Sequence, residues 1–153
     1  MAILPEQFME FWKQNAFPSK DATLLLAVSG GLDSVVMTRL FYESGFSCTI
    51  AHCNFQLRGN ESDDDEMFVR QLAGNYNFGF ISKCFDTLNF AKDNSLSIQM
   101  AARHLRYQWF GELIRQQQFE AVAVAQHADD VAETILLNLI RGTGLAGLHG
   151  IKA

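Results

Sequence analysis

One stretch of the chain has the residue types and the position that an anion site requires. It reads Ser29-Gly30-Gly31-Leu32-Asp33-Ser34. An apolar run of strand length precedes it, and a segment with helical apolar spacing follows it. Glycines permit a tight turn there, and the free N–H groups and dipole of a helix N-terminus favour negative charge above it. The string lacks the lysine of a Walker-type loop and the third glycine of a dinucleotide fingerprint. We predict a phosphate site, the alternative being an ordinary strand-to-helix turn with a capping side chain.

A second group of charged residues follows the predicted strand at 121–126. Asp129, Asp130 and Glu133 lie within five residues of one another, beside His127. Asp130 and Glu133 have capping-box spacing, but the remaining charge would be repulsive without a cation. Mg²⁺ prefers such oxygens, and a substrate ammonium would also fit, with a carboxylate taking its proton. We expect a cation site rather than a purely structural cap. The sequence leaves open which of Asp129 and Asp130 is the base.

Two arginines, Arg103 and Arg106, stand three residues apart on a predicted long helix. This spacing puts both on one side of the helix, where they could meet a phosphate or the charge of a transition state. Paired helical arginines are also common on protein surfaces. We favour a functional role, with Arg103 slightly ahead of Arg106.

The turn after the second predicted strand contributes His52, Asn54 and Arg58. In an open α/β sheet, this turn lies beside the glycine-rich turn at the carboxyl ends of the strands. Arg58 could pair with phosphate or be a solvated loop residue, and His52 could serve the site or be a satisfied, half-buried histidine. In the acidic run 61–66, we expect Ser62 to be an N-cap followed by carboxylates in the first helical turn, rather than a metal site.

These strings together resemble a known family. The glycine string alone resembles the signature of the PP-loop, or N-type ATP pyrophosphatase, superfamily. The string from His52 to Ser62, the Ala-Arg-x-x-Arg-Tyr string, the string from His127 to Thr134 and the glycine-rich segment 141–150 are similar to one branch, the tRNA(Ile)-lysidine synthetases.

The resemblance implies a role for each matching position. The residues implied to hold ATP are Ser29, Gly30, Gly31, Leu32, Asp33, Ser34, His52 and Asn54. The residues implied to bind Mg²⁺ are Asp33 and Asp129. The residues implied to contact lysine or tRNA are Arg58, His127, Asp129, Asp130, Glu133 and Arg141. The residues implied to be catalytic are Asp33, Arg103, Arg106 and Asp130.

The implied activity is an ATP-dependent ligation that modifies tRNA. The wobble cytidine of tRNA(Ile) with a CAU anticodon would be adenylylated at C2 and then attacked by L-lysine, releasing pyrophosphate and AMP. Two alternatives stay open: a PP-loop tRNA thiolase, disfavoured because no cysteines are paired in sequence, and an ATP-binding module that is inactive in isolation. In the family, tRNA-binding domains follow, and we expect them to be absent from this chain.

Composition agrees with a single cytoplasmic domain. The chain has 153 residues, 48% of them hydrophobic, which suffices for one core. A net charge of −5 suits a free-standing nucleic-acid binder poorly. We interpret the three cysteines as small buried residues of a reducing compartment. No apolar run approaches the ~20 residues of a membrane span, and no secretion signal is evident. The oligomeric state is left open between a monomer and a homodimer.

The alternation of elements predicts an α/β fold: a doubly wound, mainly parallel sheet with helices on both faces. The predicted strands are 22–28, 48–54, 78–85 and 121–126. The predicted helices are 4–15, 33–44, 63–76, 97–118 and 130–140. We expect residues 1–20 to form a helix packed on a PP-loop domain of residues 21–153, with Phe8, Phe11 and Trp12 in the core.

Overall fold

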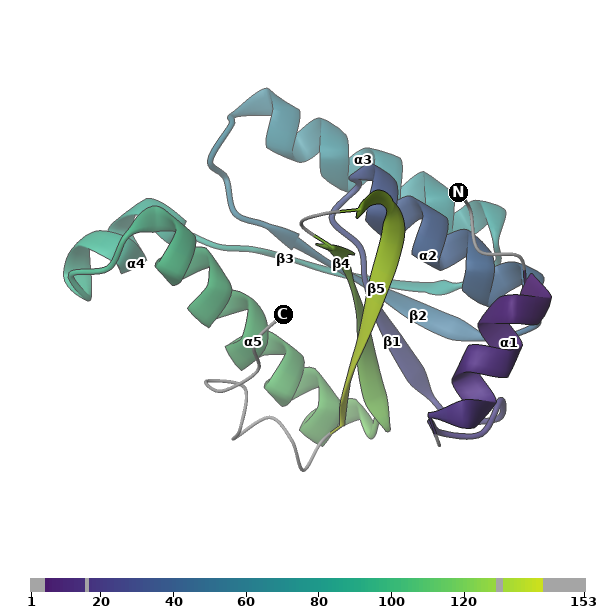
Figure 1. The fold of residues 1–153 in the computed structure, drawn as a ribbon. Coiled ribbons are helices and arrows are strands. Elements are labelled where there is room, and N and C mark those ends of the chain that lie inside the picture. The colour runs from purple at the N-terminus through teal and green to yellow at the C-terminus, as the bar shows by residue number, and fades with distance from the viewer. Residues whose placement is uncertain (1–4, 16, 129–130, 142–153) are drawn as a thin grey trace.

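The computed structural model describes residues 5–15, 17–128 and 131–141, and it confirms the predicted α/β architecture (Figure 1). The helices are α1 (Pro5–Gln14), α2 (Leu32–Glu43), α3 (Asn60–Asn75), α4 (Thr87–Asp93) and α5 (Ile98–Gln117). The strands are β1 (Leu24–Ala27), β2 (Cys48–Asn54), β3 (Gly79–Cys84), β4 (Ala121–Ala128) and β5 (Val131–Arg141). They form one sheet in the order β3-β2-β1-β4-β5, with the first four parallel and β5 antiparallel to β4.

The central strand β1 is covered on both faces, as its uninterrupted apolar sequence predicts. Leu24 and Leu26 point into a core that α1, α2 and α3 close. Leu25 points the other way, into a second core that α5 closes. Figure 1 shows these two helical layers on opposite sides of the sheet. The carboxyl ends of β1, β2 and β4 therefore open between the layers.

Helix α1 joins the first of these cores through aromatic side chains. Phe8 and Trp12 are each 3% exposed. The Phe8 ring lies 5.1 Å from that of Phe41, and the Trp12 ring lies 5.1 Å from that of Phe46. Core positions were thus correctly predicted for Phe8 and Trp12. The prediction was wrong for Phe11, which is 40% exposed and packs edge-on against Phe17.

The predicted helix at 130–140 is wrong, because residues Val131–Arg141 form strand β5. Its backbone pairs along the edge of β4, for example Leu139 with Ala123. Without β5, the edge of β4 would present unpaired N–H and C=O groups. Several residues of this segment are β-branched and favour extended backbone: Val131, Thr134, Ile135 and Ile140. The helix was predicted because the apolar residues of this segment also fit a helical period.

Helix α4 was not predicted. It begins after Asp86, whose side chain accepts a hydrogen bond from the Asn89 N–H and so caps it. The next helix, α5, has a similar cap, since the Ser97 hydroxyl accepts from the Met100 N–H. Across the described part of the chain, none of the helices combines the length and the hydropathy needed to cross a bilayer.

Candidate functional site

A cavity of about 520 Å³ lies where the carboxyl ends of the strands open. This volume is in the range of small-molecule sites, roughly 300–1,000 Å³. The glycine loop (residues 29–34) and the loop after β2 (residues 55–59) border it, and α5 contributes Arg106 and Phe110. The structure therefore brings together many of the predicted site residues: Ser29, Gly31, Leu32, Asp33, Ser34, His52, Asn54, Arg58 and Arg106.

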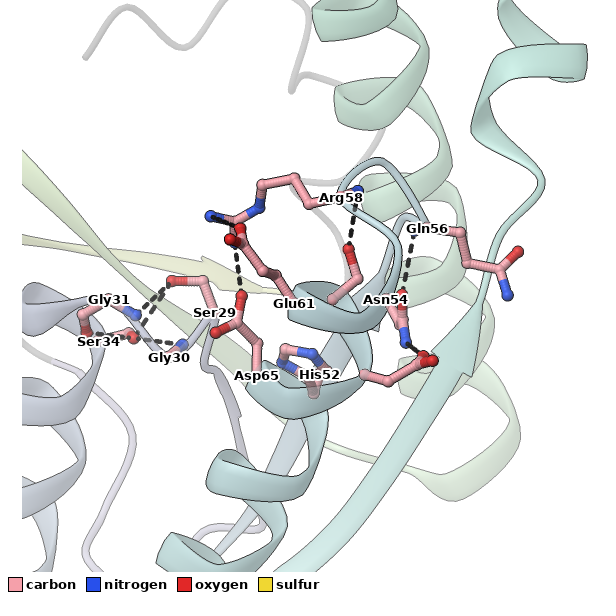
Figure 2. A network of polar contacts seen from close by, with 12 residues as sticks. Ser29, Gly30, Gly31, Ser34, His52, Asn54, Gln56, Arg58, Glu61 and Asp65 are labelled. Atoms are coloured by element: carbon pink, nitrogen blue, oxygen red, sulfur yellow. Dashed lines mark hydrogen bonds and ion pairs between the residues drawn. The ribbon is translucent and has the colours of Figure 1, made fainter.

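The glycine loop forms hydrogen bonds to its own serines (Figure 2). The Gly30 N–H donates to the Ser34 hydroxyl and the Gly31 N–H to the Ser29 hydroxyl, each at 3.2 Å. Ser34 in turn donates to the Gly31 carbonyl at 2.9 Å, and the two hydroxyl oxygens are 3.3 Å apart. Two backbone donors thus converge on oxygen acceptors at the loop, which is the arrangement that a phosphate oxygen requires.

Gly30 is needed for its backbone conformation, and it lies close to α3. Its φ is +98°, a region that side-chain-bearing residues rarely adopt. A Cβ added there would lie 3.5 Å from Val69 Cγ2 and 3.8 Å from the Phe68 ring. The loop therefore lies close to α3, but these are ordinary van der Waals distances, so the requirement for glycine comes from φ.

Asp33 lies in the first turn of α2, where the helix dipole favours a negative charge. Its side chain borders the cavity, as does that of Leu32, which is 76% exposed. The α2 N-cap is Gly31, without a side-chain capping bond. The predicted alternative of a capping side chain is therefore not found at the N-cap position itself, although the Ser29 hydroxyl accepts a hydrogen bond from the Gly31 N–H.

His52 is buried beside the cavity at 2% exposure. Its Nδ1 lies 2.8 Å from the Val28 carbonyl. Because a carbonyl only accepts, Nδ1 carries the proton, and Nε2 of a neutral ring is an acceptor. His52 is thus a buried histidine with one hydrogen-bonded nitrogen, and it also borders the cavity. Its hydrogen bond and its place beside the site, which the sequence offered as alternatives, occur together.

Asn54, 1% exposed, holds the loop of residues 55–59 in place. Its Nδ2 donates to Asp63 at 3.0 Å, and its Oδ1 accepts from the Gln56 N–H at 3.0 Å (Figure 2). Both ends of the amide therefore have protein partners. Although Asn54 borders the cavity, this geometry indicates that it positions the loop.

Arg58 reaches from this loop to α3, where its Nη2 lies 2.5 Å from Asp65 Oδ2 and its Nη1 3.8 Å from Glu61 Oε2. The side chain is 63% exposed. It is therefore neither a freely solvated arginine nor a buried one. Its backbone N–H donates to the Ser62 hydroxyl at 3.1 Å.

The predicted N-cap at Ser62 is wrong. Helix α3 begins at Asn60, with Gly59 at the N-cap position and no capping side chain. Ser62 lies in the first turn, where its hydroxyl binds the loop instead. The carboxylates that follow still lie near the helix N-terminus, and no three metal-ligating side chains are grouped anywhere in the described residues.

Arg103 and Arg106, both in α5, have different surroundings. Arg106 borders the cavity, with its guanidinium carbon 5.4 Å from the centre of the Phe55 ring. Arg103 is exposed, lies over the Tyr107 ring at 5.1 Å and does not line the cavity. The structure thus places Arg106, rather than the slightly preferred Arg103, at the candidate site.

Comparison with known proteins identifies the family. A family model described as a PP-loop domain matches residues 3–153. The chain belongs to the PP-loop family. It is 48% identical over 139 residues to the tRNA(Ile)-lysidine synthase of Porphyromonas gingivalis and 49% identical over 132 residues to that of Bacteroides thetaiotaomicron. These matches cover 91% and 86% of this chain.

The relatives are longer proteins. The PP-loop chain spans 31% of the length of each of those two relatives. The tRNA(Ile)-lysidine synthase of Chlorobaculum tepidum is 42% identical over 151 residues, and this match covers 46% of that protein. A solved structure of NMN synthetase from Francisella tularensis has a TM-score of 0.56 at 19% identity, covering 78% of this chain and 53% of that one. That likeness concerns the fold alone.

All three cysteines of the PP-loop chain are free, and their thiols resist ionisation. Burial raises the pKa of Cys48 and of Cys53 to about 12, although Arg106 partly offsets the effect at Cys53 through its charge and a hydrogen bond. Cys84 is exposed, so the prediction that all three are buried is wrong. Partial desolvation and the nearby Glu66 and Asp63 also raise the Cys84 pKa.

The predicted cation site of the PP-loop domain falls largely outside the described residues. Asp129, Asp130 and the glycine-rich segment 142–150 are outside the residues that the structure describes. The backbone places His127 in β4, opposite Ile135. Glu133 and Arg141 belong to β5, so the predicted helical capping box at Asp130 and Glu133 is wrong.

Sequence reasoning missed Asp65 and Phe55, which also border the cavity. A signal for Asp65 was present, because Ser62, Asp65 and Val69 recur at helical spacing on one side of α3. Each contacts the loops: Ser62 and Asp65 bind Arg58, and Val69 packs under Gly30. For Phe55, no comparable pattern exists in the sequence.

Proposed function

We propose that this PP-loop domain carries the chemistry of a tRNA(Ile)-lysidine synthase. It would activate the wobble cytidine of tRNA(Ile) with ATP and then join L-lysine to it. The observation that supports this most is the convergence of the glycine loop, Arg58 and Arg106 on one cavity. The names of the relatives, which are 42–49% identical, supply the reaction.

The cavity suits a triphosphate on two grounds. The Gly30 and Gly31 N–H groups already bind oxygen at 3.2 Å, and serine hydroxyls could yield these donors to phosphate. Two arginines, Arg58 and Arg106, also line the cavity. A phosphate chain bound there could therefore pair with guanidinium groups as well as with the glycine loop.

Asp33, which lines the cavity, would supply a carboxylate to Mg²⁺. Mg²⁺ is usually bound by one or two carboxylates together with substrate phosphates. Asp129 is the proposed second protein ligand. When bound, Mg²⁺ would neutralise phosphate charge. Asp33 lies in the first turn of α2, beside the glycine loop proposed to hold the phosphates.

In the first proposed step, the cytidine O2 attacks the α-phosphorus of ATP and the bond to the β-phosphate oxygen breaks. The glycine loop holds the departing pyrophosphate through its N–H groups and serines. Negative charge builds on the α-phosphate oxygens as the new bond forms. Arg106, which lies over Phe55 and lines the cavity, would stabilise that charge.

In the second proposed step, the lysine ε-amine attacks C2 and AMP leaves with the former O2. The amine must lose a proton, which Asp129 or Asp130 would accept. His127, Glu133 and Arg141 are proposed to hold lysine or tRNA near them. The proposed substrate implies a cytoplasmic protein, and a homodimer remains a prediction.

The test is a reaction of the protein with ATP, Mg²⁺ and a transcript of tRNA(Ile) bearing CAU, with and without isotopically labelled lysine. We expect lysidine in the nuclease digest by mass spectrometry, with AMP and pyrophosphate formed in equal amounts. A transcript carrying uridine at the wobble position is the matched control and should stay unmodified. ATP binding without lysine incorporation would indicate a nucleotide-binding module, and sulfur incorporation a thiolase.

A further inference from the structure

The Arg58–Asp65 ion pair spans the edge of the cavity, and both residues line it. Figure 2 shows the guanidinium of Arg58 directed back at α3, toward Asp65 and Glu61. Asp65 is also close to the phosphate loop, since a Cβ added at Gly30 would lie 4.0 Å from the Asp65 Cβ. Asp65 therefore lies close both to Arg58 and to the glycine loop proposed to hold phosphate.

The backbone donors of the same site are likewise engaged within the protein. The Gly30 and Gly31 N–H groups bind the Ser34 and Ser29 hydroxyls. A bound phosphate would therefore have to replace protein acceptors at the glycine loop, and to draw in Arg58 it would have to replace Asp65. Serine hydroxyls and the Asp65 carboxylate thus accept the hydrogen bonds that a bound anion would otherwise accept.

We propose that Asp65 is a positioning residue that competes with the nucleotide phosphates for Arg58. It keeps the guanidinium at the edge of the cavity and releases it when a multiply charged phosphate binds. This inference rests on the proposed function, because it assumes that the ligand of the glycine loop is a triphosphate or pyrophosphate.

The strength of the ion pair suits a competition of this kind. The Arg58 and Asp65 side chains are 63% and 40% exposed, so solvent screens their attraction. A pyrophosphate group carries more charge than one carboxylate and accepts paired hydrogen bonds from a guanidinium. The loop that carries Arg58 is bounded by Gln56 and Gly59, which both have positive φ, of 53° and 55°. The release of Arg58 could use a change of backbone angle at these two positions.

The test measures binding of pyrophosphate with Mg²⁺ by isothermal titration calorimetry. Asp65→Asn frees Arg58, and we expect its Kd to fall about threefold, a typical effect for an exposed ion pair. Asp64→Asn removes the same charge one residue away on α3, where the side chain is exposed and does not border the cavity. We expect it to leave the Kd unchanged. Asp65→Glu, which keeps the carboxylate, should bind as the wild type does.

A double-mutant cycle separates competition for Arg58 from a general charge effect. Arg58→Gln should weaken binding, and adding Asp65→Asn to it should then have no further effect. If Asp65→Asn increased the affinity for pyrophosphate equally with and without Arg58, the proposal would be overturned. An unchanged or higher Kd for Asp65→Asn alone would overturn it too. If the wild-type protein bound neither ATP nor pyrophosphate, the proposed function would be overturned as well. If it bound them but the cycle gave no coupling energy between Arg58 and Asp65, only the proposed role of Asp65 would be overturned.

Discussion

The guanidinium of Arg106 lies over the ring of Phe55, with 5.4 Å between its central carbon and the ring centre. This contact joins α5 to the loop after β2, two segments about fifty residues apart in the sequence. Phe55 is itself stacked on Phe85, with 5.6 Å between ring centres and 24° between planes. Arg106 therefore rests on a fixed aromatic support at the edge of the cavity.

Replacing Arg106 by alanine should lower kcat for AMP release by about 100-fold. The loss of one donor to transition-state charge typically costs about 3 kcal/mol. Arg103→Ala is the matched control, because it removes the same side chain one helical turn away, outside the cavity. Its kcat should stay within about twofold of the wild type. A larger loss for Arg103→Ala than for Arg106→Ala would contradict the assignment.

Phe55→Leu should lower kcat through Arg106, by about fivefold, the effect of a cation–π contact of about 1 kcal/mol. Phe55→Tyr keeps the ring face and should retain most of the activity. In an Arg106→Ala background, Phe55→Leu should have little additional effect on kcat. Steady-state kinetics on the four variants checks this, and additive losses would show that Phe55 acts independently of Arg106.

Gly30→Ala should destabilise the domain by about 1–2 kcal/mol, because alanine is strained at a φ of +98°. The control is Gly74→Ala near the end of α3, where an added Cβ meets nothing within 4 Å. That change should stabilise the helix by about 0.5–1 kcal/mol. Urea unfolding measures both. Equal changes in the free energy of unfolding would show that the conformation of Gly30 is not required.

Iodoacetamide should modify Cys84 before Cys53 at pH 8. The thiolate is the reactive form, and burial raises the pKa of Cys53 to about 12, so very little of it is ionised. The rate at Cys53 should rise about tenfold per pH unit between pH 7 and 9, as its thiolate fraction does. Arg106→Ala should slow it further, since Arg106 lowers that pKa. Peptide mass spectrometry gives the order, and early modification of Cys53 would contradict it.

The parts of the fold that the sequence predicted are those set by local pattern. Strand β1 is a continuous apolar run because both its faces are buried, and the glycine loop is recognisable because few residues tolerate its backbone. Strand β5 was missed because pairing with the edge of β4, a tertiary interaction, determines its conformation. For Asp65, helical spacing with Ser62 and Val69 was a signal, but its partner could not be predicted, because only folding brings it to Arg58.

Asp33→Ala should abolish tRNA-dependent exchange of pyrophosphate with ATP while the domain stays folded. The proposed role of Asp33 is to bind Mg²⁺ beside the phosphates, so its loss removes charge neutralisation from the adenylylation step. The melting temperature of the variant, measured beside its activity, should show that the domain is still folded. Asp21→Ala is a control at an exposed position before β1. Exchange at the wild-type rate in Asp33→Ala would refute the metal role, and exchange lost together with the fold would require Asp33→Asn to decide the question.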